Sequence, residues 1–333
     1  MNRITFTRYP GNPIIPRTPG TFFSIFSANP DLLIFNDMYY LYFRGQAEAG
    51  HDQIGVACTR PGNFDGIHWK FAPENPILRV GADADDFDSG HILDPATIVW
   101  NGQVYLYYSA HNINWKTRNA PSGIGLAVST DGIRFGKHLQ NPVVYGTAPE
   151  AIVFQNRVHL FFQRRCAAGY FEIHHCPSDD GMTFSERDAR IVFRPSAIPG
   201  AFDEYSISTV RIWPEGDWFY MVYGGCDRFY DYPIAFGLAR SRDLLDWERY
   251  PGNPIFARGE AGTWDEGAVW FATMYNHRGK YLLWYEGAGC GIDSSTEQGK
   301  RASQECRDQD YGGYGKTSFS QIGLAFFEGS LAW

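Results

Sequence analysis

Short runs of alternating apolar and polar residues recur along the whole chain, separated by Asp-Gly or Gly-Asn-Pro turns. Alternation with a period of two, in segments rich in β-branched and aromatic residues, predicts antiparallel strands, and these turn sequences predict the hairpins between them. Each unit contains one strand that is especially aromatic. The five aromatic strands span residues 39–43, 105–108, 159–162, 219–223 and 281–285.

The repeat is also visible as sequence identity. Residues 8–14 (Arg-Tyr-Pro-Gly-Asn-Pro-Ile) recur letter for letter at 249–255, and weaker copies of the Asn-Pro end stand at 75–77 and 141–143. Units of 40 or more residues with several strands each are typical of propeller blades. We therefore predict an all-β chain that forms a single five-bladed β-propeller over residues 1–333, with a β-sandwich as the alternative.

The repeat is out of phase with the chain ends. The chain opens with an Asn-Pro-Ile strand that elsewhere ends a unit, and it closes with the Ile-Gly-Leu-Ala strand (322–325) that elsewhere precedes one. We expect residues 1–16 to pair with 321–327 in the last blade, which closes the ring and leaves no free sheet edge. Residues 287–320 interrupt the pattern with a polar, glycine-rich insertion, which is either surface decoration or a lid over the site.

Composition excludes several classes of protein. With 10 Trp, 20 Tyr and 25 Phe, the chain is too aromatic to be disordered. The net charge of −8 argues against nucleic acid or an anionic membrane as the main partner, whereas a neutral sugar is compatible. Neither a transmembrane helix nor a signal peptide is predicted, so we expect a cytoplasmic protein.

The cysteines and histidines give no sign of a disulfide framework or a metal. The six cysteines are irregularly spaced, without a Cys-x-x-Cys motif, so buried free thiols in a reducing compartment are the favoured interpretation. Only Cys290 and Cys306 share one polar segment in which pairing is conceivable. His91 and the pair at 174–175 have no partner at metal-ligand spacing, and we predict no metal or other cofactor.

Acidic residues fall at equivalent positions of three predicted inner strands. When the prolines at positions 30, 95 and 149 are placed in register, Asn29, Asp94 and Ala148 coincide, and so do Asp31 and Glu150. Positions two apart on a strand face the same way, so Asp31, Asp94 and Glu150 are expected to converge on one pocket. Carboxyls that lie close together raise one another's pKa. One of them can then be protonated while another is ionised, which is the combination that glycoside hydrolysis requires. Alternatively, these acids satisfy amides of turns and strand starts.

A second acidic pattern, an aromatic residue followed by aspartate, occurs three times, at 87–89, 202–204 and 264–266. In each copy the aromatic residue stands 21 residues before a tyrosine of an aromatic strand. Triple repetition favours a structural role for the central aspartate. The glutamates that follow, Glu204 and Glu266, are candidates for binding substrate hydroxyls at the mouth of the funnel.

The blade-start acids, the Asp-Pro at 94–95, and the Ser-x-Asp-Gly-x-x-Phe and Asn-Pro-Ile blade ends resemble five-bladed propeller glycosidases. The resemblance is chiefly to family 43, with related families 32, 117 and 130, and it covers essentially the whole chain. It implies a general base in the first blade, a pKa-tuning Asp in the second and a general acid Glu in the third. Asp94 matches the second and Glu150 the third. The first is Asn29, so either Asp31 serves as the base or another acid does.

These observations predict a glycoside hydrolase that is inverting and exo-acting on a furanoside or pyranoside of an oligosaccharide. Two alternatives stay open: a phosphorylase, in which phosphate replaces the base, and a non-catalytic propeller that binds carbohydrate or protein. The remaining candidates for contacts with the sugar are aromatic, amide or cationic side chains. They are Asn29, Trp115, Arg164, Arg211 and Trp270.

Overall fold

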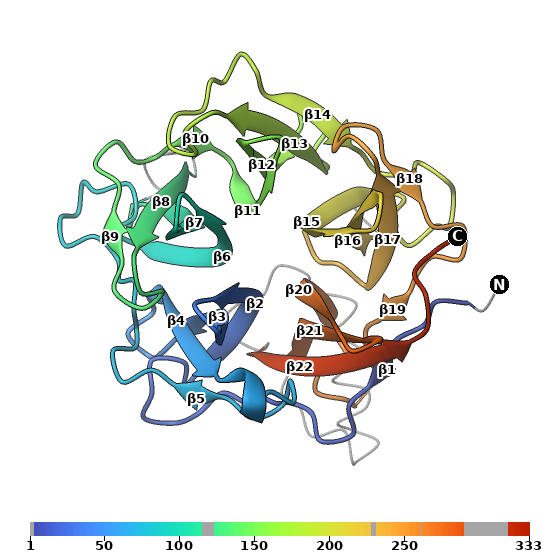
Figure 1. Ribbon diagram of the computed structural model, residues 1–333, viewed down its shortest axis with the longest axis horizontal. Helices are drawn as coiled ribbons and strands as arrows, with labels where there is room; N and C mark the ends of the chain where they lie inside the picture. The colour runs from blue at the N-terminus through green and yellow to red at the C-terminus, as the bar shows by residue number, and fades with distance from the viewer. Residues whose placement is uncertain (1–2, 115–122, 228–230, 261, 290–318) are drawn as a thin grey trace.

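Five antiparallel sheets form a closed ring in the computed structural model of the chain (Figure 1). The structure describes residues 3–114, 123–227, 231–260, 262–289 and 319–333. Each sheet consists of an inner, a middle and a third strand, followed outward by short strands. The chain is therefore an all-β, five-bladed propeller, as the repeat predicts.

The inner strands lie nearest the centre of the ring (Figure 1). They are β2 (Phe26–Phe35), β6 (His91–Trp100), β11 (Thr147–Phe154), β15 (Ser206–Glu215) and β20 (Ala268–His277). The middle strands are β3 (Met38–Gln46), β7 (Gln103–His111), β12 (Arg157–Arg165), β16 (Trp218–Cys226) and β21 (Lys280–Gly289). The predicted aromatic segments all lie in these middle strands.

The third strands are β4 (Asp52–Thr59), β8 (Gly123–Ser129), β13 (Phe171–Ser178), β17 (Ala235–Ser241) and β22 (Phe319–Glu328). The short outer strands are β1 (Thr7–Arg8), β5 (Lys70–Phe71), β9 (Gly136–Lys137), β10 (Val144–Tyr145), β14 (Arg190–Phe193), β18 (Glu248–Arg249) and β19 (Phe256–Ala257). We number the blades 1 to 5 in the order of their inner strands. Among the described residues the only helix is the single turn η1 (Pro61–Asn63), and none is long and apolar enough to cross a membrane.

The N-terminal segment completes blade 5. Strand β1 pairs antiparallel with β22, where Arg8 lies opposite Ala325, and Ile15 forms a further bridge to Ile322. The guanidinium of Arg8 also donates to the Asp265 carboxylate of the same blade at 2.8 Å. The predicted closure of the ring by residues 1–16 and 321–327 is confirmed.

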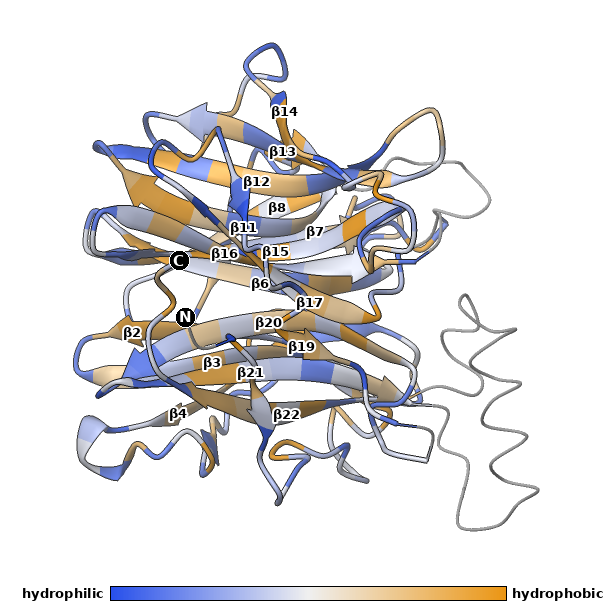
Figure 2. Cartoon of the chain, turned by 90° about the vertical axis from the view of Figure 1, so that its right-hand side faces the viewer, coloured by the Kyte–Doolittle hydropathy of each residue, from blue (hydrophilic) through white to orange (hydrophobic). Residues whose placement is uncertain are grey.

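The hydrophobic core lies between neighbouring blades. Leu41 and Phe43 of blade 1, for example, belong to one buried cluster with Trp284 and Leu324 of blade 5. Figure 2 shows hydrophobic segments running along most strands of the ring. Burial of apolar surface contributes about 25 cal/mol per Å², so these interfaces are the main source of stability.

In four blades an asparagine side chain binds the third strand as a neighbouring strand would, in addition to the short outer strands. The Asn253 side-chain oxygen accepts a hydrogen bond from the Leu238 N–H at 2.8 Å, and its amide donates to the Leu238 carbonyl at 3.0 Å. The same paired bonds join Asn12 to Leu324, Asn75 to Val56 and Asn141 to Leu126. This strand-like pairing explains why Asn-Pro-Ile or Asn-Pro-Val recurs in the sequence.

The repeated aspartates of the second acidic pattern bind tyrosines of the middle strands. The Tyr108 hydroxyl donates to Asp88 at 3.1 Å and accepts from the Asn141 amide, while Lys137 pairs with the same carboxylate at 2.7 Å. Equivalent tyrosine–aspartate bonds join Tyr223 to Asp203 and Tyr285 to Asp265. These aspartates therefore have a structural role.

The described cysteines carry free thiols: Cys58, Cys166, Cys176 and Cys226. Cys176 and Cys226 are buried, and the other two are half-buried. Cys290 and Cys306 lie outside the described residues.

Replacing Asn141 by alanine should destabilise the protein by about 2–4 kcal/mol, because the Leu126 N–H and carbonyl would both lose their partner. Urea unfolding followed by fluorescence measures this loss. The control is Gln140→Ala at the exposed neighbouring position, which should stay within ~0.5 kcal/mol of wild type. Equal stability of the two variants would contradict the structural role of the asparagine.

Candidate active site

A β-bulge near the start of the inner strands separates the two acidic positions that the sequence aligns. In blade 1 the register shifts between Ala28 and Asp31, and Asn29 adopts a positive φ of 50°. Asp94 and Ala148 have the same left-handed conformation, with φ of 57° and 50°. Regular alternation does not hold across a bulge, so positions two apart no longer face the same way. Asp94 therefore belongs to a different cluster from Asp31 and Glu150.

Asp31 and Glu150 lie on either side of the buried Arg211 guanidinium. Nε of Arg211 is 3.5 Å from Oδ1 of Asp31, and Nη1 is 3.3 Å from Oε2 of Glu150. Arg211 also donates to the backbone carbonyls of Pro95 and Pro149 at 2.6 and 2.9 Å. The guanidinium thus occupies the space between the two carboxyls.

Both carboxyls also bind backbone of the next blade. Oδ2 of Asp31 accepts from the N–H and hydroxyl of Thr97 at 2.8 and 2.5 Å, and Oε1 of Glu150 accepts from the Ile212 N–H at 2.8 Å. The cavity that these groups line has a volume of about 110 Å³. Sites for small organic ligands usually measure about 300–1,000 Å³, so this cavity is too small for a sugar chain.

Burial dominates the electrostatics of this pair. It raises the pKa of Glu150 to about 8, since Arg211 offsets only part of the effect and Asp31 adds to it. Burial likewise raises the pKa of Asp31, again against the opposing effect of Arg211. The cluster of Asp31, Glu150 and Arg211 therefore retains a proton near neutral pH.

Asp94 is the centre of a second polar cluster. Burial raises its pKa to about 7; the Ser109 hydroxyl and Arg44 oppose the shift, and the Asp231 and Glu286 carboxyls add to it. The residue is 4% exposed. Asp94 is thus a carboxylic acid that is half protonated near neutral pH.

The middle strands supply polar side chains to this cluster from equivalent positions. Each of them lies opposite an isoleucine of the third strand of its blade. They are Arg44, Ser109, Gln163 and Glu286. All four are buried. Buried polar groups at one level of several blades are characteristic of a site rather than of a core.

Glu286 connects blade 5 to blade 1. Its Oε2 accepts from the side-chain amide and the N–H of Asn29 at 3.1 and 3.3 Å, and its Oε1 accepts from the Ser320 hydroxyl at 2.6 Å. Asn29 is 1% exposed, and within the described part of the chain its Oδ1 has no hydrogen-bond partner. Asn29 is therefore in the Asp94 cluster, held by Glu286.

Asp231, which the sequence did not single out, is the third carboxyl of the cluster. It lies between β16 and β17, outside every repeated motif, and the Ser208 hydroxyl donates to it at 2.5 Å. Trp270 also donates to this carboxyl, and burial raises the pKa of Asp231. Trp270 is half-buried and packs edge-on against Tyr232.

Arg44 is fixed by a second buried acid. Oδ1 of Asp52 accepts from Nε of Arg44 at 2.7 Å, and Oδ2 lies 2.8 Å from Nδ1 of His91. Burial acts to raise the pKa of Asp52, but Arg44 and His91 outweigh it and hold the pKa below its ordinary value. The cation beside Asp94 is thus already paired with a carboxylate.

Three of the predicted contact residues bind elsewhere. Glu204 and Glu266 each accept a hydrogen bond at 2.7 Å from the N–H four residues earlier in their own turns. Arg164 pairs with Glu186 at 2.6 Å and donates to the Tyr145 carbonyl. These partners belong to turns and outer strands, and a role of the three residues in sugar binding stays a prediction.

Trp115 lies outside the described residues, as does most of the predicted 287–320 insertion. The ends of that insertion are described. Gly289 pairs with Phe319 across β21 and β22, and Ser320 binds Glu286. The insertion therefore leaves and rejoins the sheet beside the Asp94 cluster, while its role as a lid stays a prediction.

Among the described residues, no group of three or more His, Cys, Asp and Glu side chains has the arrangement of a metal site.

Comparison with known proteins identifies no relative from sequence: no family model and no curated protein matches the chain. Solved structures match over nearly the whole length. The β-1,2-mannobiose phosphorylase from Listeria innocua has a TM-score of 0.69 at 13% identity, covering 98% of this chain and 97% of that one. An N-acetylgalactosamine deacetylase from F. plautii has a TM-score of 0.67 at 14% identity, covering 97% and 95%. A thermostable family-43 glycoside hydrolase has a TM-score of 0.60 at 17% identity, covering 82% and 87%.

This likeness establishes the fold. The similar structures are five-bladed propellers, and glycoside hydrolases and phosphorylases are prominent among them, together with a deacetylase. One fold can support several reactions, so the reaction must be argued from the side chains of the site.

Replacing Glu150 by glutamine should make the free energy of unfolding less dependent on pH, so that the variant gains stability relative to wild type as the pH rises. The folded-state pKa of about 8 lies above the ordinary value of 4.5, so the folded protein binds the proton more tightly than the unfolded chain. The stability from this group is therefore present below about pH 4.5 and is lost as the pH rises towards 8. Glutamine has no such proton and keeps an oxygen to accept from Ile212.

Urea unfolding at pH 5, 6, 7 and 8 measures this prediction. The free energy of unfolding of Glu150→Gln minus that of wild type should rise through this pH range and level off above it. Glu48→Gln, at an exposed position, is the control and should give no comparable trend. A difference that stays constant with pH would contradict the raised pKa.

Proposed function

We propose that this protein cleaves glycosidic bonds of oligosaccharides by acid–base catalysis, with Asp94 as the general acid. The observation that supports the proposal is the pKa of about 7 at a buried carboxyl that lies beside Asp231 and Glu286. A departing sugar oxygen needs a proton, and a carboxylic acid that is still protonated near neutral pH can supply it. Glycoside hydrolysis uses such an acid together with a second carboxyl and needs no cofactor.

Asp231 is proposed as the second carboxyl, the base that activates water. It is half-buried, whereas Glu286 is fully buried and accepts hydrogen bonds from Asn29 and Ser320. Water therefore has better access to Asp231. The bonds from Ser208 and Trp270 fix the orientation of Asp231, and the charge of Glu286 acts on both Asp231 and Asp94.

Trp270 is the proposed surface for the sugar ring. It is half-buried and bonded to Asp231, so a sugar that stacks on the indole lies next to the proposed base. Aromatic faces are suited to the apolar face of a pyranose or furanose.

This proposal reassigns the roles that the resemblance implies. It makes Asp94 the acid instead of a modulator, and it gives Asp31 and Glu150 a structural role. Their cavity holds about 110 Å³, and the Arg211 guanidinium lies between them. No room is left there for the sugar and the water that an inverting reaction places between its two carboxyls.

Hydrolysis fits the cluster better than phosphorolysis. The cation that acts on Asp94 is Arg44, which Asp52 already neutralises, and an incoming phosphate would meet Asp231 and Glu286. Like charges in a buried site repel strongly, so water is the favoured nucleophile. Turnover of a panel of aryl furanosides and pyranosides and of natural disaccharides, with and without phosphate, tests this choice. Proton NMR of the reaction mixture identifies which anomer of the released sugar forms first, and this tests whether the reaction inverts the configuration.

Asp94→Asn should lower the rate by roughly 10²–10⁴-fold, because proton donation typically contributes that much. An aryl glycoside with a good leaving group needs less protonation and should partly escape the defect. The control is Glu150→Gln, a matched loss of one buried carboxyl, which should keep activity within a few-fold of wild type. Loss of activity in the glutamine variant, with retention in the asparagine variant, would transfer the acid to Glu150.

The pH profile should report Asp94. The acid works only when protonated, so kcat/KM should fall as the pH rises through about 7. The measurement is initial rate at low substrate concentration from pH 5 to 9, on a substrate with a poor leaving group. A profile that instead rises through pH 7 would mean that this group acts as a base.

A further inference from the structure

Blade 3 places two histidines at positions that are otherwise filled by apolar or tyrosine side chains. Along the third strands, His175 is equivalent by register to the apolar residues Val56, Leu126, Leu238 and Leu324. His159 is equivalent, along the middle strands, to Tyr40, Tyr105, Tyr220 and Leu282. A buried imidazole in place of leucine adds nothing to apolar packing, so the pair needs another explanation.

The two rings form an incompletely satisfied pair. Nδ1 of His159 lies 2.8 Å from Nε2 of His175, and the rings are stacked with centroids 5.1 Å apart. His175 is 3% exposed, and its Nδ1 has no hydrogen-bond partner within the described part of the chain. Burial lowers the pKa of His175 to about 3, with added contributions from His159, Arg190 and Arg157. The free protein thus has a buried polar atom without a partner, surrounded by positive charge.

The interface between blades 3 and 4 also differs from other interfaces. At three of the other four interfaces a middle-strand side chain donates to a turn carbonyl of the next blade: Tyr42 to Gly132, Tyr107 to Gly181 and Trp284 to Gly66. In blade 3 the corresponding residue is Phe161, which has no donor. The turn of blade 4 has Leu244 at the glycine position, with a φ of 69°. Strained backbone of this kind is often found at binding sites.

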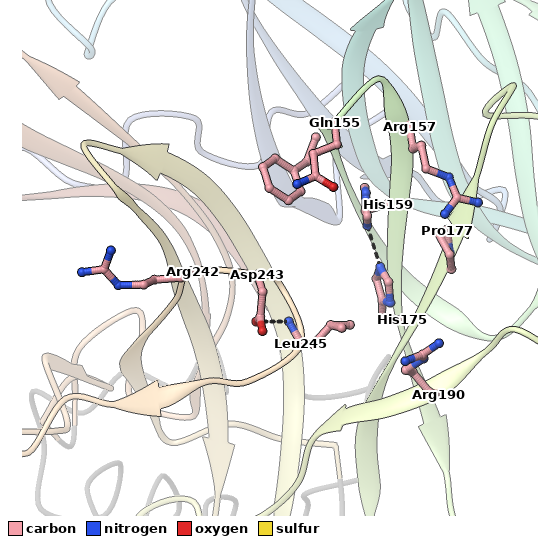
Figure 3. A pocket seen from close by; sticks show the side chains of 10 residues that line it. Gln155, Arg157, His159, His175, Pro177, Arg190, Arg242, Asp243 and Leu245 are labelled. Atoms are coloured by element: carbon pink, nitrogen blue, oxygen red, sulfur yellow. Dashed lines mark hydrogen bonds between the residues drawn. The ribbon is translucent and has the colours of Figure 1, made fainter.

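A cavity of about 350 Å³ lies at this interface. Arg157, Arg190, His159 and His175 line it from blade 3, and Arg242 lines it from blade 4 (Figure 3). The guanidinium of Arg242 stacks on the Trp218 ring at 4.2 Å, so Arg157 and Arg190 supply the positive charge beside the histidines. Its apolar wall consists of Phe154, Pro177 and Leu245.

Little acidic charge in the cavity balances these arginines. The Asp243 carboxylate accepts hydrogen bonds from Leu245 and from Ser241 in its own turn. Arg157 pairs with Asp179, whose side chain is 83% exposed. Within the described ranges no acidic group pairs with Arg190. The cavity therefore combines positive charge and an apolar wall, and the incompletely satisfied histidine pair is among its lining residues.

We propose that this cavity binds a small anionic molecule, a phosphate or carboxylate group on a sugar-sized skeleton. The anion binds Arg157, Arg190 and the histidine pair, since arginine guanidinium groups recognise both phosphate and carboxylate. The carbon skeleton packs on Phe154, Pro177 and Leu245. The volume lies within the range of about 300–1,000 Å³ that is usual for such ligands.

This site is separate from the Asp94 cluster. Ala148, which is equivalent to Asp94, stands at the start of β11, and Phe154 stands at its end. Six residues of strand span roughly 20 Å. The inference therefore holds whether or not the proposed glycosidase activity is found.

Isothermal titration calorimetry of the full chain with glucose 6-phosphate, glucuronate, inorganic phosphate and glucose tests the proposal. We expect saturable binding of glucose 6-phosphate or glucuronate, and the stronger of the two identifies the anion. Arg190→Gln should weaken that binding roughly 10- to 100-fold, because it removes charge-assisted hydrogen bonds. Arg134→Gln removes the same charge from an exposed turn of blade 2 and should leave the affinity unchanged.

His175→Leu installs the residue found at this position in other blades. It should fold with a melting temperature equal to or above that of wild type, and it should bind the anion more weakly than wild type. A large fall in melting temperature with unchanged affinity would make the histidine purely structural and overturn the proposal. So would equal affinities of Arg190→Gln and Arg134→Gln, no saturable binding of either sugar acid, or inorganic phosphate that binds as tightly as glucose 6-phosphate.

Discussion

The arrangement of this propeller depends on side chains that satisfy the backbone of the neighbouring blade along the inner strands. Each inner strand is the edge of its sheet on the side of the ring centre, so N–H groups along that edge need acceptors outside the sheet, and a buried N–H without a partner is costly. Asp31 accepts from Thr97 of the next blade, and Glu150 accepts from Ile212. Thr273 does the same for Leu32 across the junction between blades 5 and 1.

A second set of hydrogen bonds between blades lies on the other side of the bulges, around the candidate active site. Ser109 accepts from the Ala148 N–H, and it also donates to the Asp94 carboxyl. Glu286 accepts from the Asn29 N–H. The polar groups that hold adjacent blades together are therefore the same groups that surround Asp94, so the geometry of the site is fixed by the closure of the ring.

The two sets differ in charge balance, and this difference decides their chemistry. In the first set, Arg211 lies between Asp31 and Glu150, so the net charge of these three groups is close to zero when Glu150 is protonated. In the second set, Arg44 is neutralised by Asp52, and the remaining carboxyls face one another. Burial, with a further contribution from the Asp231 and Glu286 carboxyls, raises the pKa of Asp94 into the range in which a carboxylic acid can donate a proton near neutral pH. The cavity between blades 3 and 4 has the opposite imbalance, an excess of arginine.

The sequence by itself determined the repeat, the number of blades and the closure of the ring, because strand alternation and turn motifs are local and recur in order. It also singled out Asp94, Asn29 and Trp270, which the structure places in or beside one polar cluster. It could not separate Asp94 from Asp31 and Glu150, since the left-handed residue in each bulge leaves no pattern that distinguishes it from a regular strand. Nor could it find Asp231, which lies in an unrepeated loop, or Arg44, which reads as one more residue of an aromatic strand. Only the tertiary structure decided which carboxyls meet, because burial and charge balance arise between blades that are distant in sequence.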